Sequence, residues 1–374
     1  MTDQGLLGIE NSAFEEFRKV VAQVHKPATV NSVLSVDYIE DRILEWIEKH
    51  VRGEIGPETQ FVTFLSTCAG RDVRKRKVAI PVSFLTIDRP FCLGAIMFEY
   101  LRKDLFDEWE SRSPLAADGS ATPKGRLTPL RKRYQGVVCC SMEVEGETTR
   151  AIQRATTEAR MAINVLRFFT PACAVAVPCF YGLMGRTLVP TSHALVFDDP
   201  VPDIVEGMET PALPYQIMSE DLKEFERHGW NLAGQLLTTK TKTAFEETVF
   251  DTIQLFARAI EAQDTQDKLL YALVAAETLL LRDQSEPILV HLWLRLAFLV
   301  ELDVAGRREI KELVQDAYKR RSAFVHHGEI DVSPVTLSGI FITVWTAIRN
   351  ALVVSGDFKT KADFLDYLEN RILT

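Results

Sequence analysis

The sequence changes character near residue 219, and this change limits the folds open to the chain more than any other feature. Before it, short segments rich in β-branched and aromatic residues alternate with helical segments. After it, apolar residues recur at intervals of three and four, which is the spacing of helices with one buried face. We therefore predict an α+β protein, with a mixed α/β domain over residues 1–239 and an all-helical bundle over 240–374.

The N-terminal domain is expected to begin with helices and to continue as a mixture of strands and helices. Its helical start covers residues 1–55, in which Ser35 has the side chain of a helix N-cap. Residues 113–131 are rich in Pro, Gly, Ser and Thr without a period, so they are predicted to form a loop. Helices are predicted at 12–25, 36–51, 103–112 and 147–169. Strands are predicted at 59–66, 77–87, 92–101 and 134–144, with two or three more within 172–218.

The C-terminal part is expected to consist of helices alone, and Pro287 suits the first position of one of them. The predicted helices are 219–228, 243–262, 266–282, 287–300, 306–326, 335–355 and 360–372. A spanning helix needs about 20 apolar residues. Proline, glycine or hydroxyl residues interrupt the uncharged runs 168–185 and 332–348, so both are predicted to be buried core and not membrane segments.

The composition fits a globular protein with a large core, since 47% of the 374 residues are hydrophobic and 25% are charged. The net charge of -9 argues against broad attraction to nucleic acid, so RNA binding would need a local basic patch. Six cysteines lack a CxxC pair or a zinc-site spacing, which predicts buried, reduced thiols. The first residues lack the basic and apolar regions of a signal peptide. We therefore expect a cytoplasmic protein with no metal site and no cofactor.

The segment 310–326 is predicted to place an arginine on the buried face of a helix. Seven residues form one stripe on a helical wheel: Ile310, Leu313, Val314, Ala317, Tyr318, Phe324 and Val325. Arg321 lies near the centre of this stripe, whereas Lys319 and Arg320 point outward. An inward guanidinium needs a charged partner or a polar cleft. Because Glu277 is the only charge in the apolar run 269–281, the two residues are expected to form an ion pair.

Two histidines follow Arg321 at the expected end of this helix. His326 comes five residues after Arg321, and Gly328 fits a helix C-cap. The negative end of the helix dipole stabilises a protonated imidazole. Such a pair supports RNA cleavage without a metal, because the imidazole moves protons at the 2′-hydroxyl or the 5′-oxygen while the guanidinium neutralises the phosphate. From the residues alone, two other roles stay open: capping of the last carbonyls by the histidines, and a purely structural Arg–Glu pair.

The two helical segments together resemble the signature of the Apea-like HEPN domains. The segment AYKRRSAFVHHGE (317–329) is similar to the family's helix with an arginine, a polar residue, several apolar residues and a histidine. The segment DKLLYALVAAETLLL (267–281) is similar to the family's other marked helix. The matching residues there are Ala275, Glu277, Leu279 and Leu280. The resemblance covers about 240–374 and implies an all-α HEPN bundle, which forms a homodimer through this domain with a composite cleft between two motif helices.

The resemblance also implies an activity and roles for single residues. Members of this family are metal-independent endoribonucleases of single-stranded RNA such as tRNA or mRNA, found in toxins, antiviral defence and stress responses. Arg321 matches the phosphate-binding arginine and His326 the catalytic histidine, while Ser322 takes a polar position that is Asn or Asp in many members. Glu277 would orient the arginine and His327 would assist. Because some HEPN domains lack catalysis, the alternative is a dimerisation or binding module with a structural Arg–Glu pair.

Basic residues outside the motif pair are candidates for contact with an RNA backbone. One run precedes the predicted strand at 77–87, and the alternative for it is a solvated loop. The candidates are Arg71, Arg74, Lys75, Arg76 and Lys77, with Lys319 and Arg320 beside the HEPN-like motif. The N-terminal domain has no Gly-rich phosphate loop and no nucleophile elbow. We therefore expect it to sense a trigger or to restrain the nuclease, and the sequence does not identify that regulator.

Overall fold

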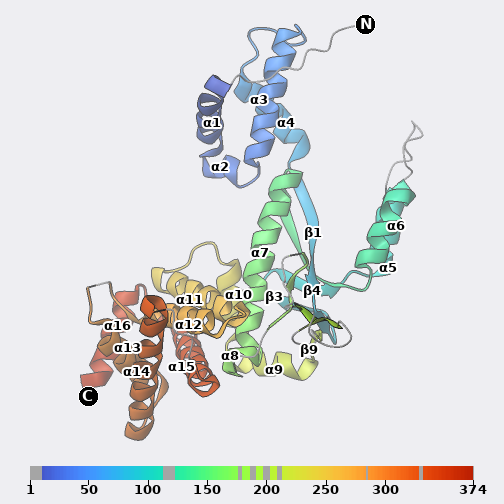
Figure 1. Cartoon of the computed structure of the whole chain (residues 1–374). Coiled ribbons are helices and arrows are strands. Elements are labelled where there is room, and N and C mark those ends of the chain that lie inside the picture. The colour runs from blue at the N-terminus through green and yellow to red at the C-terminus, as the bar shows by residue number, and fades with distance from the viewer. Residues whose placement is uncertain are drawn as a thin grey trace. The chain divides into compact units, whose positions relative to one another are not determined.

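The computed structural model describes residues 11–112, 123–175, 179–185, 191–196, 203–208, 213–283, 285–327 and 332–373 (Figure 1). The fold is mixed α+β, as predicted. The chain divides into two compact units, of which unit 1 comprises 1–80 and 141–158, and unit 2 comprises 81–140 and 159–374. This division differs from the expected border at residue 240, because residues 81–140 and 159–239 group with the C-terminal helices.

Unit 1 is built around helices, and the helical start predicted over 1–55 is confirmed from residue 11 onward, whereas residues 1–10 lie outside the described residues. Its elements are α1 (Asn11–His25), α2 (Ala28–Asn31), α3 (Val36–Val51) and α4 (Phe61–Asp72), with parts of β1 (Arg74–Ser83), β5 (Val138–Gly146) and α7 (Thr148–Phe169). The Ser35 hydroxyl accepts a hydrogen bond from the Tyr38 backbone N–H, so the predicted N-cap is present. A small apolar core holds the helices together and consists of Val21, Leu34, Ile39, Ile43 and Leu65.

The strand predicted at 59–66 is wrong, because these residues begin helix α4. The β-branched and aromatic residues of this segment favoured a strand on local grounds. In the structure Leu65 and Cys68 are buried on one face of the helix, three residues apart. Leu65 belongs to the same core as Ile39 and Ile43 of α3. Packing against a neighbouring helix therefore overrides the local preference.

A five-stranded sheet has the strand order β3-β4-β5-β1-β6. The segment 92–101, predicted as one strand, forms an antiparallel hairpin of β3 (Phe91–Leu93) and β4 (Ile96–Tyr100), with Gly94 in its turn at a φ of 59°. The other predicted strands before residue 172 are present as β1, β2 (Leu85–Ile87) and β5. Two or three strands were expected within 172–218, and the described residues of this range form four: β6 (Gly182–Leu183), β7 (Thr191–Val196), β8 (Asp203–Met208) and β9 (Tyr215–Ile217).

The loop predicted at 113–131 is only partly testable and is wrong where it is described. Residues 113–122 lie outside the described residues, but 123–131 belong to helix α6 (Pro123–Tyr134). Arg131 of α6 forms ion pairs with Asp107 and Glu110 of α5 (Lys103–Arg112), and its guanidinium lies 5.9 Å from the centre of the Phe106 ring. These contacts with a second helix stabilise a segment whose own composition is typical of a loop.

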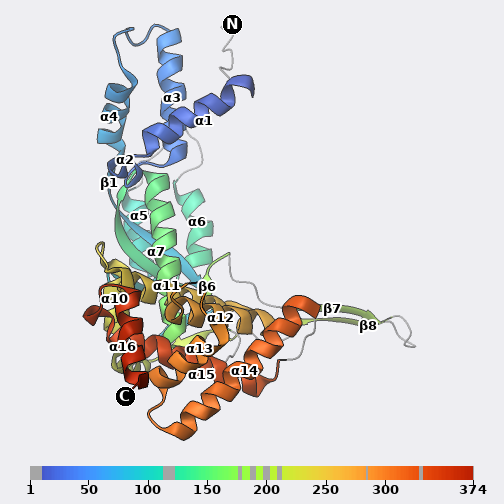
Figure 2. The same ribbon diagram turned by 90° about the vertical axis from the view of Figure 1, so that its left-hand side faces the viewer.

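The C-terminal helices follow the predicted ranges within a few residues (Figure 2). They are α9 (Ser219–Arg227), α11 (Ala244–Glu261), α12 (Thr265–Leu280), α13 (Ile288–Val300), α14 (Val304–His327), α15 (Pro334–Val353) and α16 (Lys361–Leu373). Among the α-helices described after residue 170, α8 (Ala172–Val175) and α10 (Trp230–Thr238) were not predicted. Pro287 caps α13 one residue before the helix and not from its first position. Helix α15 is long and apolar enough to cross a membrane, but 56% of its apolar window is buried, which fits a core helix.

One lysine is buried in the helical part, and it predicts a pH-dependent stability. The Lys268 side chain is 2% exposed and donates a hydrogen bond to the Ile260 carbonyl at 3.1 Å. Burial lowers its pKa to about 8. Between pH 8 and the unfolded value of about 10.4, the folded chain releases this proton while the unfolded chain keeps it, so the free energy of unfolding rises with pH.

We therefore expect wild-type stability, measured against Lys268→Met by denaturant unfolding, to increase by about 2–3 kcal/mol between pH 8 and 10.4. The methionine variant removes the titrating group and keeps a similar volume. Other titrating groups are common to both proteins and cancel in the difference. A difference that stays constant over this pH range would contradict the burial of a charged lysine.

Candidate active site

Helix α14 carries the predicted motif, and its inner face is largely as predicted. Ile310, Val314 and Ala317 are buried, and Leu313, Tyr318 and Phe324 are partly buried. Val325 is 58% exposed, so its predicted place in the buried stripe is wrong. His326 next to it is also exposed. The last turn of α14 therefore projects beyond the core that buries the earlier turns.

The predicted ion pair between Arg321 and Glu277 is confirmed. Nη1 of Arg321 lies 2.5 Å from Oε1 of Glu277, which α12 contributes from the facing side. The Arg321 and Glu277 side chains are 26% and 19% exposed, so the ion pair is partly buried and still has some contact with solvent. At this depth the partner carboxylate compensates much of the desolvation of the guanidinium.

A third residue, Tyr318, completes this contact and was not singled out from the sequence. Its hydroxyl donates a hydrogen bond to the same Glu277 oxygen, and the Arg321 guanidinium lies 5.5 Å from the centre of the Tyr318 ring. Burial, together with the Glu277 carboxylate, raises the pKa of the Tyr318 hydroxyl. The phenol therefore stays a hydrogen-bond donor at neutral pH, and the arginine is fixed from two sides.

The residues next to Arg321 differ in their environment. Lys319 is exposed, as predicted. Arg320 was predicted to point outward, but its side chain is 25% exposed and its Nε lies 2.8 Å from Oδ2 of Asp316. That ion pair lowers the pKa of the Asp316 carboxyl. Arg320 is held inward because the Thr336 hydroxyl of α15 donates to the same carboxylate oxygen at 3.0 Å.

Arg320 and Arg321 both face a shallow hollow beside α12. The residues that line it are Gln266, Leu269, Leu270, Arg320, Arg321, Phe324 and Val332. A positive side chain at the edge of an apolar hollow is suited to an anionic group that approaches from outside. The hollow leaves no room for a water molecule, and Arg321 is 26% exposed and already paired with Glu277. A phosphate would therefore reach this guanidinium only from the solvent side.

The histidines and Ser322 lie at the outer end of the motif. Ser322 and His326 are exposed, and the side chain of His327 lies outside the described residues, as does Gly328. Five residues of α-helix turn the chain by about 140°, so Arg321 and His326 leave α14 in different directions. Within one chain, Arg321 and His326 therefore do not face the same point in space.

The basic run before the sheet is split by the structure. Arg71 lies near the end of α4, and the other four residues begin strand β1, so the run does not form the solvated loop that was the alternative for it. Because side chains alternate along a strand, Arg74 and Arg76 point to one side and Lys75 and Lys77 to the other. Arg71, Arg74 and Arg76 line a pocket in unit 1, whereas the two lysines are exposed.

The cysteines are free, and five of the six are buried. Cys92 is exposed, so the prediction of six buried thiols is wrong at this position, which lies in the short edge strand β3. Burial raises the pKa of Cys173 to about 12, which keeps this thiol protonated and unreactive. Among the described residues, no group of three or more His, Cys, Asp and Glu side chains is placed to hold a metal ion.

Comparisons with known proteins do not identify a family for this chain. No protein-family model, no curated protein and no solved structure matched the chain. The resemblance to HEPN domains therefore depends on the two segments around Glu277 and Arg321, and the function has to be inferred from the residues themselves.

Proposed function

We propose that this protein is a metal-independent endoribonuclease of the HEPN type, which cleaves single-stranded RNA in the cytoplasm as part of antiviral defence or a stress response. The observation that carries the proposal is the setting of Arg321. Glu277 and Tyr318 hold this arginine at the rim of a hollow, and the exposed imidazole of His326 follows five residues later. A fixed guanidinium and an accessible imidazole are the two groups that metal-free RNA cleavage requires.

The proposed reaction is a transesterification within the RNA chain. The ribose 2′-oxygen attacks the adjacent phosphorus, the bond from phosphorus to the 5′-oxygen breaks, and a 2′,3′-cyclic phosphate forms. A neutral imidazole accepts the 2′-hydroxyl proton, and a protonated imidazole supplies a proton to the leaving 5′-oxygen. Arg321 stabilises the extra negative charge on the phosphate during the transfer.

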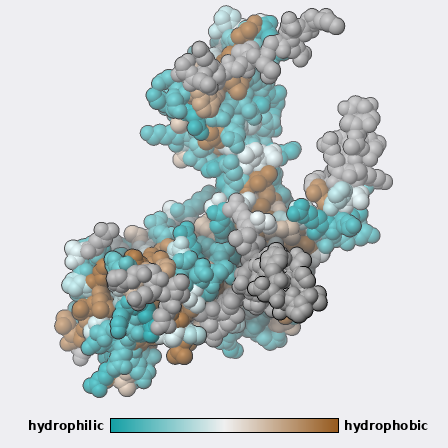
Figure 3. Space-filling view, viewed as in Figure 1, coloured by the Kyte–Doolittle hydropathy of each residue, from teal (hydrophilic) through white to brown (hydrophobic). Residues whose placement is uncertain are grey.

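A homodimer would bring the required groups together. Arg321 and His326 leave one helix in different directions, so a second copy of α14 is the simplest source of the missing imidazole. Apolar residues are exposed around the motif, with Val325 at 58% and Val335 at 82%, and apolar patches are also visible on the helical part in Figure 3. Contact between two copies across these residues would bury apolar surface beside the proposed site.

A non-catalytic binding or dimerisation module is the second candidate. It is favoured by one observation: Arg321 already has a carboxylate partner in Glu277, so its charge needs no ligand. In that case the pair would serve to hold α12 against α14. The two candidates differ in whether the protein cleaves RNA. They also differ in whether Arg321 serves catalysis or only the stability of the fold.

Cleavage that depends on the ribose 2′-hydroxyl is the expected result for the first candidate. We expect the purified chain to cut a random-sequence single-stranded RNA in the presence of EDTA and to leave the matching 2′-O-methyl RNA intact. The products should end in 2′,3′-cyclic phosphate, which mass spectrometry identifies. Equal cutting of the two substrates, or loss of cutting on addition of EDTA, would refute the proposed reaction.

A further inference from the structure

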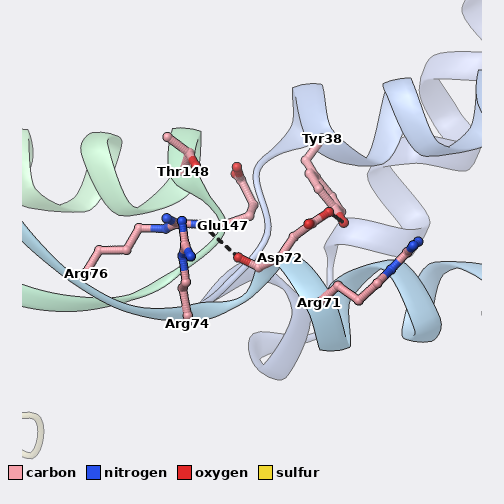
Figure 4. A pocket seen from close by; sticks show the side chains of 7 residues that line it. All are labelled: Tyr38, Arg71, Asp72, Arg74, Arg76, Glu147 and Thr148. Carbon is pink, nitrogen blue, oxygen red and sulfur yellow. Dashed lines mark hydrogen bonds between the residues drawn. The ribbon is translucent and has the colours of Figure 1, made fainter. Parts of the chain in front are cut away.

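Unit 1 contains a polar pocket that the proposed nuclease site does not use. Its volume is about 350 Å³, within the range of pockets that bind small molecules. The residues that line it are Tyr38, Arg71, Asp72, Arg74, Arg76, Glu147 and Thr148, shown in Figure 4. Three of these seven residues are arginines and two are acidic. Which ligand the pocket can bind therefore depends on whether the acidic residues neutralise the arginines.

The pocket forms where three elements end or begin. Helix α4 ends at Asp72, strand β1 begins at Arg74, and helix α7 begins at Thr148. Strand alternation turns Arg74 and Arg76 to the same side. In Figure 4 both arginines extend toward Glu147 and Thr148, whereas Arg71 extends away from them, beyond Asp72.

The two acidic residues of the pocket bind other donors and leave the arginines without an ionic partner. The Glu147 side chain is 4% exposed and caps α7, since its Oε2 accepts from the Thr149 N–H and its Oε1 from the Arg150 N–H, both at 2.7 Å. Oδ2 of Asp72 accepts the Tyr38 hydroxyl at 2.6 Å. Within the described part of the chain, none of the pocket's arginines forms an ion pair with a carboxylate.

Backbone carbonyls hold Arg76 in place without neutralising it. Its Nε donates to the Gly146 carbonyl at 3.1 Å, and its Nη2 donates to the Asp72 carbonyl at 2.9 Å. The side chain of Arg74 is exposed and makes no hydrogen bond or ion pair with another described residue. Two positive groups that line one pocket repel each other, and an anion between them lowers the electrostatic energy.

We propose that this pocket binds a small phosphate-bearing ligand, with Arg74 and Arg76 on the phosphate and the Thr148 hydroxyl as a further donor. The planar guanidinium matches the oxygens of a phosphate group in two parallel hydrogen bonds. An RNA backbone is a poorer fit, because Lys75 and Lys77 face away from the pocket. The proposal does not depend on the nuclease activity.

The test is calorimetric titration of the full chain at constant ionic strength with adenosine 5′-monophosphate, inorganic phosphate and adenosine. Both phosphate probes are expected to bind and to raise the midpoint of thermal unfolding, and adenosine is expected to do neither. Arg74→Gln should weaken binding of the monophosphate about tenfold or more, because a charged hydrogen bond is lost. Arg74 has no partner among described residues, so this variant should fold normally. Lys75→Gln is the matched control, since it removes the same charge from the opposite side of the strand.

Three results would overturn the proposal. One is the absence of both heat and a shifted midpoint with either phosphate probe. Another is an equal loss of affinity in Arg74→Gln and Lys75→Gln, which would indicate diffuse attraction. The third is binding of a single-stranded RNA without terminal phosphates that depends on Arg74 as strongly as the monophosphate does, which would indicate an RNA surface. Because the readout is binding, loss of RNA cleavage would leave this proposal unaffected.

Discussion

The rate of RNA cleavage should fall about 10²–10³-fold in Arg321→Ala and about 10²–10⁴-fold in His326→Ala. The first change removes the charge that stabilises the phosphate during transfer, and the second removes the proton donor or acceptor. Single-turnover cleavage of a labelled RNA measures both effects. Arg308→Ala is the control, because it removes an exposed arginine from the same helix far from the motif and should retain the wild-type rate.

A loss of folding must be separated from a loss of catalysis in Arg321→Ala. Removing one partner of a partly buried ion pair should lower the free energy of unfolding by about 1–3 kcal/mol, between the ranges for exposed and buried pairs. Replacing both partners by apolar residues often restores stability. The double variant Arg321→Met with Glu277→Met should therefore regain part of the stability without regaining cleavage, since the Tyr318 hydroxyl still lacks its acceptor.

The same variants decide between the two candidate functions. If the double variant is stable and cleaves RNA at the wild-type rate, Arg321 has no catalytic role and the binding module remains. His326→Ala gives an independent check, since His326 is exposed at the end of α14 and its removal should change thermal unfolding less than Arg321→Ala does. A fully active His326→Ala would therefore rule out the proposed proton transfer at this position.

The Arg321–Glu277 contact could be predicted because each residue is an isolated charge in an otherwise apolar helical stripe. Helical periodicity places both on inner faces, and two charges that must be buried have few alternatives to each other. Tyr318 was missed as a partner for the converse reason. Tyrosine is compatible with an apolar core, so its position three residues before Arg321 did not mark it as polar.

Features created by contacts between distant segments could not be predicted in the same way. Helix α6 has a loop-like composition and depends on α5, and α4 has strand-like residues that pack against α3. The polar pocket of unit 1 joins residues near 38, 72 and 148, whereas the basic run alone resembles a solvated surface. Local preference decides such segments only where no neighbouring element competes with it.

A buried arginine in the helical part illustrates the same limit, because its partners lie far apart in the sequence. Arg295 of α13 is 1% exposed. Its Nη2 lies 2.8 Å from Oε1 of Glu286 and 2.6 Å from Oε1 of Glu369 in α16, and its Nη1 donates to the Leu280 carbonyl at 2.6 Å. Arg282 also pairs with Glu369, at 3.1 Å. Burying this charge is tolerable only with all these partners in place.

Arg295→Met should accordingly lower the free energy of unfolding by about 3–5 kcal/mol, because it leaves Glu286 desolvated without its partner. Arg282→Met, which removes a side chain that is 31% exposed, should have a much smaller effect in the same denaturant titration. If Arg295→Met loses no more free energy of unfolding than Arg282→Met does, the ion pairs of Arg295 contribute little to stability.

The deficit of Arg295→Met should also depend on pH. Hydrogen bonds from Arg295 lower the pKa of Glu286 to about 2, below the unfolded value of about 4.3. The pair therefore contributes its full stability above the unfolded pKa and loses it as the pH falls toward 2. In the variant, protonation of Glu286 instead relieves the burial of an unpaired carboxylate. The stability difference between wild type and Arg295→Met should shrink as the pH falls through this range, and a difference that stayed constant would show that the charge of Glu286 does not stabilise the fold.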